Sequence, residues 1–194
     1  MRIQQLYQLK TPMWSSAMAA GALGVRAPSA KIACHRYAKK GLVVRLKRDL
    51  YATRQAWDHF REEDFFMAAN RLQVPSYVSF TTALSYYQIT TQVQKSFIES
   101  VGTVRSWSQE VEGVQFRYTK LPAGLYRGFV KKENFFIALP EKAFLDTLYL
   151  TALGRYRFDL SAMDLGKMDP KEIGKQSKIF PRKMRDRMQA LWKR

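Results

Sequence analysis

Cysteine and histidine are nearly absent from this sequence, and their scarcity excludes several kinds of site. The 194 residues contain one cysteine, Cys34, and two histidines, His35 and His59. A single cysteine cannot form an internal disulfide, and these three residues cannot supply the four ligands of an ordinary structural zinc site. We therefore expect no disulfide, no metal and no other cofactor, and we expect a reducing compartment, the cytoplasm.

Acidic residues and long apolar runs are scarce as well. Asp and Glu number 16 against 33 Lys and Arg, which gives a formal net charge of +17 at pH 7. No run approaches the roughly 18 consecutive apolar residues that a membrane-spanning helix needs, so we expect no membrane partner. Residues 13–25 are too polar for a signal peptide and are better interpreted as a helix. The excess positive charge predicts a polyanionic partner.

Sequence motifs of common enzymes are also missing. The ten glycines form neither of the two usual phosphate-binding loops, which argues against nucleotide hydrolysis. A serine hydrolase would have to use His35 or His59, and no strand-elbow serine motif accompanies either one. Cys34 is interpreted as a small buried apolar residue rather than a nucleophile. We therefore expect that the protein is not an enzyme.

The positive charge is concentrated at the two ends of the chain. Residues 1–53 carry ten basic and one acidic side chain, and residues 167–194 carry ten and three. Residues 54–166 carry thirteen and twelve, so the middle is close to neutral. This distribution predicts a DNA-binding domain over residues 1–53 and a second domain over residues 54–194, which ends in a basic helical tail at 167–194.

Residues 1–53 have the element order of a winged helix-turn-helix. Ser15 or Ser16 can cap the second helix before Gly24, and Ser29 can cap the third helix before Gly41. Three helices followed by a basic hairpin predict a domain that binds duplex DNA. A three-helix bundle with a solvated basic face, or a winged helix that contacts protein, is the alternative. The expected elements are helices over 2–9, 15–23 and 29–40 and a hairpin over 42–53 that turns at 47–49.

The third helix and the hairpin tip supply the candidate DNA-contacting side chains. On a helical wheel, Ala30 and Cys34 share the packing side, while Lys31, His35 and Lys39 point the other way. That outward face suits the major groove, and the positive charge of the hairpin suits phosphates or the minor groove. The candidate DNA-binding residues are Ser29, Lys31, His35, Arg36, Lys39, Lys40, Arg45, Lys47 and Arg48.

From residue 54 the pattern predicts a mixed α/β domain, so the whole chain is expected to be an α+β protein. Helical patterns and turn residues alternate here with apolar, strand-like stretches. The expected helices cover 57–69, 80–87 with Ser79 as cap, and 141–153, followed by two in the tail that begin after Asp169-Pro170 and Phe180-Pro181. The expected strands cover 96–104, 114–121, 125–130 and 134–139.

Asp146 does not suit its position inside the helix that Pro140 is expected to begin. An aspartate lowers helix propensity there, so the pattern predicts a partner for it, either a buried backbone group or a basic side chain. A structural role is favoured over a catalytic one. The consecutive acids Glu62, Glu63 and Asp64 would point in different directions on a helix, so capping and solvation are favoured over metal binding.

Four segments of this chain resemble AbiEi-family antitoxins, in the same order and over nearly the whole length. Residues 45–51 read Arg-Leu-Lys-Arg-Asp-Leu-Tyr, and residues 75–84 read Pro-Ser-Tyr-Val-Ser-Phe-Thr-Thr-Ala-Leu. Residues 116–118 read Phe-Arg-Tyr, and residues 138–146 read Ala-Leu-Pro-Glu-Lys-Ala-Phe-Leu-Asp. The sequence departs from the family at Asp49, where glycine is usual, and at Tyr87-Gln88, where histidine-glycine is frequent.

The resemblance implies a transcriptional autorepressor that is also the antitoxin of a bacterial type IV toxin-antitoxin, or abortive infection, system. It implies double-stranded DNA as a partner, namely the protein's own promoter with inverted repeats on which it could form a dimer. The second implied partner is a nucleotidyltransferase-like toxin, which the antitoxin domain counteracts without a stable complex. Two alternatives are direct sequestration of the toxin, and an enzyme that processes nucleic acid with Glu141 and Asp146 as its acids.

Overall fold

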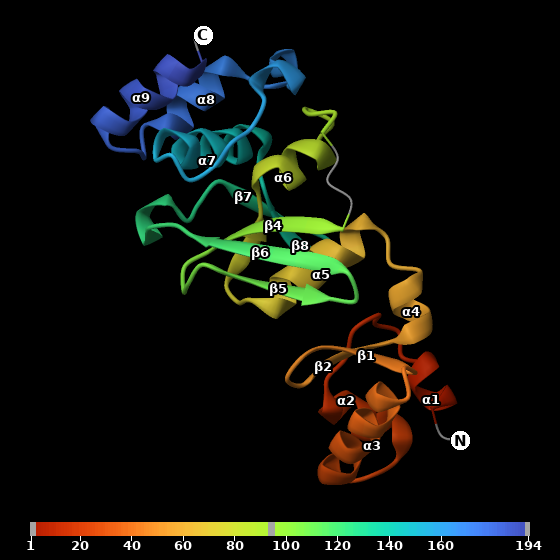
Figure 1. Ribbon diagram of the computed structural model, residues 1–194. Coiled ribbons are helices and arrows are strands. Elements are labelled where there is room, and N and C mark those ends of the chain that lie inside the picture. The colour runs from red at the N-terminus through yellow and green to blue at the C-terminus, as the bar shows by residue number, and fades with distance from the viewer. Residues whose placement is uncertain (1–2, 93–95, 193–194) are drawn as a thin grey trace. The chain divides into compact units, whose positions relative to one another are not determined.

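The computed structural model describes residues 3–92 and 96–192, and it shows an α+β protein (Figure 1). The chain divides into two compact units, Met1–Ala68 and Ala69–Arg194. The division falls inside helix α5 (Glu62–Leu72). The boundary expected after residue 53 therefore lies within the first unit. Each unit contains its own sheet.

The first unit begins with three helices and a two-stranded antiparallel sheet, drawn in red and orange in Figure 1. Its second helix has the ends that the sequence predicted. The Ser15 side chain accepts a hydrogen bond from the backbone N–H of Met18, and Gly24 ends the helix at φ +64°. The elements are α1 (Gln4–Tyr7), α2 (Ser16–Leu23), α3 (Ala27–Lys39), β1 (Val43–Lys47), β2 (Leu50–Thr53) and α4 (Arg54–Asp58).

Helix α3 begins earlier than the sequence predicted. Its N-cap residue is Arg26, and Ser29 lies inside the first turn, so the expected capping role of Ser29 was wrong. The cause is Pro28, because proline fits the first turn of a helix, where its fixed φ is helical and its missing N–H would have no partner anyway. The other end agrees with the prediction, since Lys40 is the C-cap residue and Gly41 follows with φ +70°.

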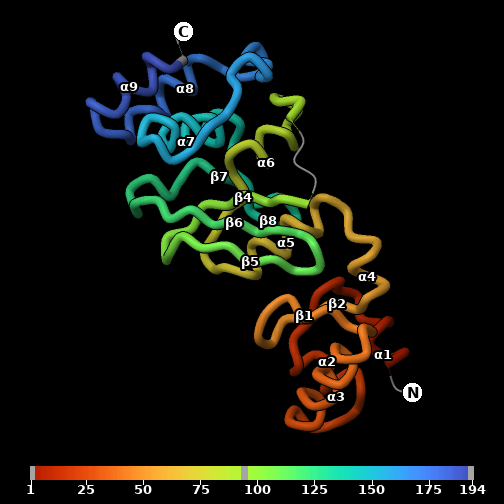
Figure 2. Tube along the Cα trace, in the orientation of Figure 1, coloured from red at the N-terminus to blue at the C-terminus, as the bar shows by residue number. Residues whose placement is uncertain are grey.

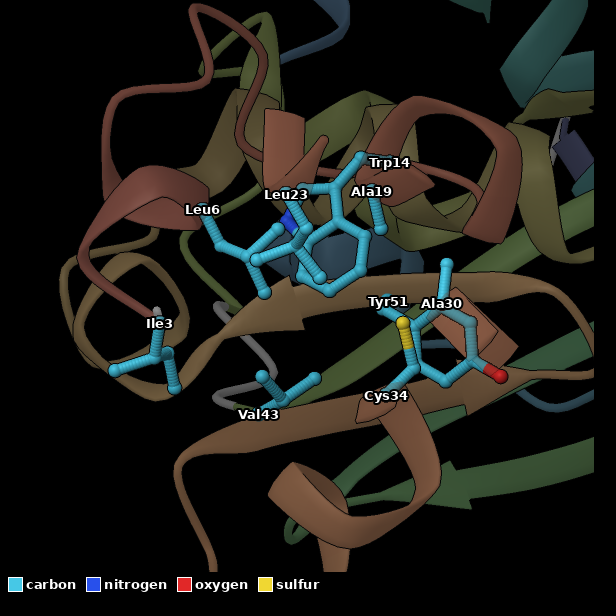
Figure 3. Packing of buried hydrophobic residues seen from close by; sticks show 9 residues of the cluster. All are labelled: Ile3, Leu6, Trp14, Ala19, Leu23, Ala30, Cys34, Val43 and Tyr51. Carbon is cyan, nitrogen blue, oxygen red and sulfur yellow. The ribbon is translucent and has the colours of Figure 1, made fainter. Parts of the chain in front are cut away.

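The core of the first unit joins the helices to the sheet, and Figure 3 shows nine of its side chains. Trp14 stacks on Tyr51 with their ring centroids 5.4 Å apart, and the two residues also exchange backbone hydrogen bonds of 2.8 and 2.9 Å. Cys34 is completely buried, and burial raises the pKa of its thiol to about 11. The interpretation of Cys34 as a small buried residue is therefore confirmed.

The second unit is built on a mixed six-stranded sheet of order β5-β6-β4-β3-β8-β7. The pairs β3–β8 and β4–β6 are parallel, and the remaining pairs are antiparallel. The sequence pattern did not predict β3, which is only three residues long, or β5, whose composition is largely polar. The strands are β3 (Ser76–Val78), β4 (Phe97–Gly102), β5 (Trp107–Val111), β6 (Val114–Lys120), β7 (Phe129–Lys132) and β8 (Phe135–Ala138).

The two C-terminal helices, α8 (Pro170–Ser177) and α9 (Arg182–Trp192), contact α7 (Pro140–Ala152), and Figure 2 shows the three helices side by side. Ile173, Phe180 and Met188 are buried, so residues 167–192 are not a detached tail. Across the described ranges, no helix combines the length and apolar character that crossing a membrane requires. The helices are α6 (Phe80–Tyr86), α7 (Pro140–Ala152), α8 (Pro170–Ser177) and α9 (Arg182–Trp192), with short 3-10 turns η1 (Ala123–Leu125), η2 (Leu160–Ala162) and η3 (Leu165–Lys167).

Asp146 has a basic side chain as a partner, which is one of the two kinds of partner that its position predicted. Lys142, one turn earlier on α7, forms an ion pair with it and also donates to the Tyr77 hydroxyl oxygen at 3.0 Å. The hydroxyls of Tyr77 and Ser79 donate to Asp146 Oδ2 at 3.0 and 2.9 Å. All four side chains are buried. Ser79 occupies the N-cap position of α6 but makes no capping hydrogen bond, so the capping role expected for its side chain was wrong.

Candidate nucleic-acid interface

The candidate DNA-binding residues lie on three consecutive parts of the first unit. Helix α3 and its C-cap carry the first six, strand β1 carries two, and the following turn carries one. All are exposed except Lys47, which is half-buried, and burial lowers the pKa of its ammonium group. In chain order they are Ser29, Lys31, His35, Arg36, Lys39, Lys40, Arg45, Lys47 and Arg48.

Four of these nine residues meet in one hollow of about 440 Å³. Helix α3 contributes two, and β1 with its turn contributes the others, so two separate parts of the first unit face the same space. The hollow is lined by Lys31, His35, Arg45 and Arg48, together with Asp49 and Tyr51. The candidates that do not line it are Ser29, Arg36, Lys39, Lys40 and Lys47.

A bulge in β1 explains why Arg45 lines the hollow and Lys47 does not. Arg45 lies opposite Tyr51 and Lys47 lies opposite Leu50, so Leu46 is an extra residue on β1. Strand alternation alone would place Arg45 and Lys47 on the same face. The bulge changes the direction of the strand, and as a result Arg45 is exposed while Lys47 is half-buried. The sequence pattern carried no signal for this bulge.

Asp49 holds the turn between β1 and β2 in place. Its backbone is left-handed, with φ 60°, and its Oδ1 atom accepts a hydrogen bond from the backbone N–H of Ser16 at 2.9 Å. Hydrogen bonds from Ser16 lower the pKa of the Asp49 carboxyl, and the charges of Lys31 and Arg48 lower it further. Sequence reasoning identified Asp49 only as a departure from glycine and missed this anchoring role.

The hollow keeps an excess of positive charge despite this carboxylate. Lys31, Arg45 and Arg48 are basic side chains, and Asp49 is the acid among the lining residues. Cationic side chains on an exposed helix face and an adjacent turn can neutralise phosphates, while side chains in the middle of the helix can reach base edges. The arrangement is therefore suited to a nucleic acid.

The acids considered for catalysis or metal binding do not share a site. Asp146 has no exposed surface, and Glu141 accepts a hydrogen bond from the backbone N–H of Asp169 at 3.2 Å. At the start of α5, Asp64 accepts one from the backbone N–H of Arg61 at 3.0 Å, which is the predicted capping role. Within residues 3–92 and 96–192, no group of three or more His, Cys, Asp or Glu side chains could hold a metal ion.

Glu99 is a buried acid that sequence reasoning missed. It lies on β4 with 2% of its surface exposed, and its Oε2 atom accepts hydrogen bonds from the hydroxyls of Thr81 at 2.8 Å and Tyr156 at 2.6 Å. Burial raises the pKa of the Glu99 carboxyl, although these two hydrogen bonds and the nearby Arg117 oppose the shift. The sequence did contain a signal for this burial, because Glu99 lies in a strand-like stretch that also contains Phe97, Ile98 and Val101.

Comparison with known proteins does not assign either unit to a family. No family model and no curated protein matches the chain. The resemblance of residues 75–84 and 138–146 to AbiEi-family antitoxins therefore stays a prediction.

Proposed function

We propose that the first unit is a winged helix-turn-helix that binds duplex DNA, with α3 in the major groove and the β1–β2 turn as the wing. The observation that carries this proposal is the convergence of the outward face of α3 and the basic turn on one hollow. A DNA-reading helix and its wing have to face the same side of a domain to contact one duplex.

Packing leaves the reading face of α3 free for DNA. Ala30 and Cys34 are fully buried, whereas Lys31 and His35 are exposed one turn apart on a neighbouring side of the helix. The major groove admits an α-helix, so both side chains would reach base edges there. Arg48, at the tip of the turn, would contact phosphates, which position a protein without reading sequence.

We propose further that the protein represses its own operon and is the antitoxin of a type IV toxin-antitoxin system. The support is the resemblance to AbiEi-family antitoxins, together with what the resembling segments do in the fold. Residues 75–84 provide Tyr77 and Ser79, and residues 138–146 provide Lys142 and Asp146, so two of the segments meet in one buried cluster.

The two departures from the family also fit this proposal. Asp49 and Gln88 stand where glycine is expected, and both have left-handed backbones, with φ of 60° and 57°. Glycine adopts such a conformation without strain, so the backbone at both positions is the one that a family glycine would suit. Residues 76–84 and 142–146 are buried, so we expect a surface that opposes a toxin to lie elsewhere on the second unit.

The DNA-binding proposal is tested by titrating the full chain with its own promoter duplex and with a scrambled duplex, measured by fluorescence anisotropy. Lys31→Ala should weaken promoter binding more than scrambled binding, by about 1–3 kcal/mol for a base contact. Arg48→Ala should weaken both equally and lower the salt slope by about 0.9 for each phosphate that is no longer neutralised. Lys131→Ala, an exposed lysine of the second unit, is the matched control.

Equal effects of Lys31→Ala on both duplexes would place α3 along the DNA backbone. If neither Lys31→Ala nor Arg48→Ala changed the affinity, DNA binding through the hollow would be refuted.

The antitoxin proposal needs a separate assay. A full chain with Arg45→Ala and Arg48→Ala should still protect cells against the toxin encoded beside it, expressed from an unrelated promoter, while repression is lost. Loss of protection would mean that the second unit does not oppose the toxin. Co-purification of the two proteins would favour sequestration.

A further inference from the structure

A groove on the second unit brings together three arginines. One hollow of about 640 Å³ is lined by Phe97, Glu99, Arg117, Arg155, Tyr156 and Arg157, among others. A neighbouring hollow of about 560 Å³ shares Phe97, Arg117 and Arg155 with the first and continues along β5 and β6 to Lys120. The shared residues make the two hollows one continuous open groove.

The segment after α7 aims two of these arginines into the groove. Helix α7 ends before Gly154, whose φ of +70° turns the chain, and the backbone N–H of Arg155 then bonds to the carbonyl of Leu150 at 2.9 Å. Tyr156 is anchored because its hydroxyl donates to the buried Glu99. Arg155 and Arg157 flank this anchor, and both are exposed.

The three arginines of the groove form no ion pair with a described residue. Among the described residues, Arg117, Arg155 and Arg157 have no carboxylate within 4.0 Å. Glu99 is the acid that lines the groove, and burial raises the pKa of its carboxyl, which favours the neutral form. The groove therefore presents an excess of positive charge to solvent.

Phe97 supplies an aromatic ring between these charges. It lies at the start of β4, is half-buried, and its ring contacts no other described aromatic ring. The other lining rings are already covered. Trp107 stacks on Tyr118, and the guanidinium of Arg105 lies 5.1 Å from the ring centroid of Trp107. Tyr156 stacks on Phe80. Phe97 is thus the lining ring with a face available for stacking.

We propose that this groove binds single-stranded nucleic acid, with Arg117, Arg155 and Arg157 on phosphates and Phe97 stacked on an unpaired base. Basic grooves that follow a backbone, combined with aromatic rings on which bases stack, hold single strands in this way. A base inside a duplex cannot stack on a side chain in a groove, so a single strand is favoured over a duplex. The proposal is independent of duplex binding by the first unit.

The test uses the full chain and labelled single strands of about ten nucleotides, in RNA and DNA form, at several salt concentrations. The double variant with Arg155→Gln and Arg157→Gln should bind single strands more weakly. Its salt slope should be lower by about 0.7 for each phosphate that is no longer neutralised. Phe97→Leu should weaken binding about tenfold while leaving the salt slope unchanged. Arg127→Gln, an exposed arginine of the same unit outside the groove, should behave as wild type.

The proposal is supported if RNA or DNA strands bind and the variants change the affinity and the salt slope as described. The strand that binds more tightly shows whether the ligand is RNA or DNA. Duplex affinity should stay unchanged in the groove variants. The proposal is overturned if the double variant binds strands as well as Arg127→Gln does, or if duplex affinity falls by the same factor. Complete displacement of the strand by an equal concentration of a free mononucleotide would also overturn it, since the site would then be a nucleotide pocket.

Discussion

Asp49 accepts a hydrogen bond from the backbone N–H of Ser16, and this bond of 2.9 Å joins the β1–β2 turn to the start of α2. The first N–H groups of a helix have no partner within the helix, and a carboxylate there also meets the positive end of the helix dipole. A non-glycine residue with φ 60° is strained, and the hydrogen bond offsets that strain. The turn that carries Arg48 is therefore positioned by a contact over 33 residues of sequence.

Removing this hydrogen bond should destabilise the first unit. We expect Asp49→Ala to lower its free energy of unfolding by about 1–2 kcal/mol, because the acceptor is removed while the strain stays. The lowered pKa of Asp49 means that the unfolded chain binds more protons in acid, so this stabilisation is lost as pH falls. Urea unfolding at several pH values measures both effects. A wild-type pH profile in Asp49→Asn would contradict the second.

Substitution of Gln88 by glycine should stabilise the protein, whereas removal of the Asp49 carboxylate should destabilise it. The φ of Gln88 is 57°, and its exposed side chain makes no hydrogen bond to a described residue, so no side-chain contact offsets the strain. Gln88→Gly is expected to raise the free energy of unfolding by up to about 1 kcal/mol, whereas Asp49→Gly should give no such gain. Thermal and urea unfolding of the two variants compare them directly. Destabilisation by Gln88→Gly would show that its side chain has a role.

The buried pair of Lys142 and Asp146 should be sensitive to single substitutions. We expect Asp146→Asn to cost about 3–5 kcal/mol of unfolding free energy, because it leaves a buried ammonium group without its counter-charge. Combining Asp146→Leu with Lys142→Met removes both charges and should cost less than Asp146→Asn alone. Glu133→Gln on the surface is the control. A cost that is equal or greater in the double variant would argue that Tyr77 and Ser79 dominate the cluster.

Glu99 should make the stability of the second unit depend on pH. Burial raises its pKa above the ordinary 4.5, so the folded chain keeps a proton that the unfolded chain has released. Its contribution to stability is therefore present in acid and is lost as pH rises from about 4.5 through the folded pKa. In Glu99→Gln this loss should disappear, while Glu110→Gln should keep the wild-type profile. Urea unfolding from pH 4 to 8 distinguishes the variants.

Local signals in the sequence determined several features of this protein by themselves. Ser15 and Gly24 set the ends of α2, and Pro140 begins α7, because capping and proline geometry act within a few residues. The outward face of α3 followed from helical periodicity alone. Asp146 was expected to have a partner because its cost to the helix is local, although its partners were not identified.

Only the tertiary structure decided which distant groups meet. Ser79 bonds to Asp146 across 67 residues instead of capping its own helix, and Tyr156 anchors on Glu99 across 57 residues. Such pairs depend on strand order and on the packing of helices against the sheet, which local backbone preferences do not specify. The same reason applies to the bulge at Leu46 and to the burial of Phe180, since both arise from contacts that no short window of sequence contains.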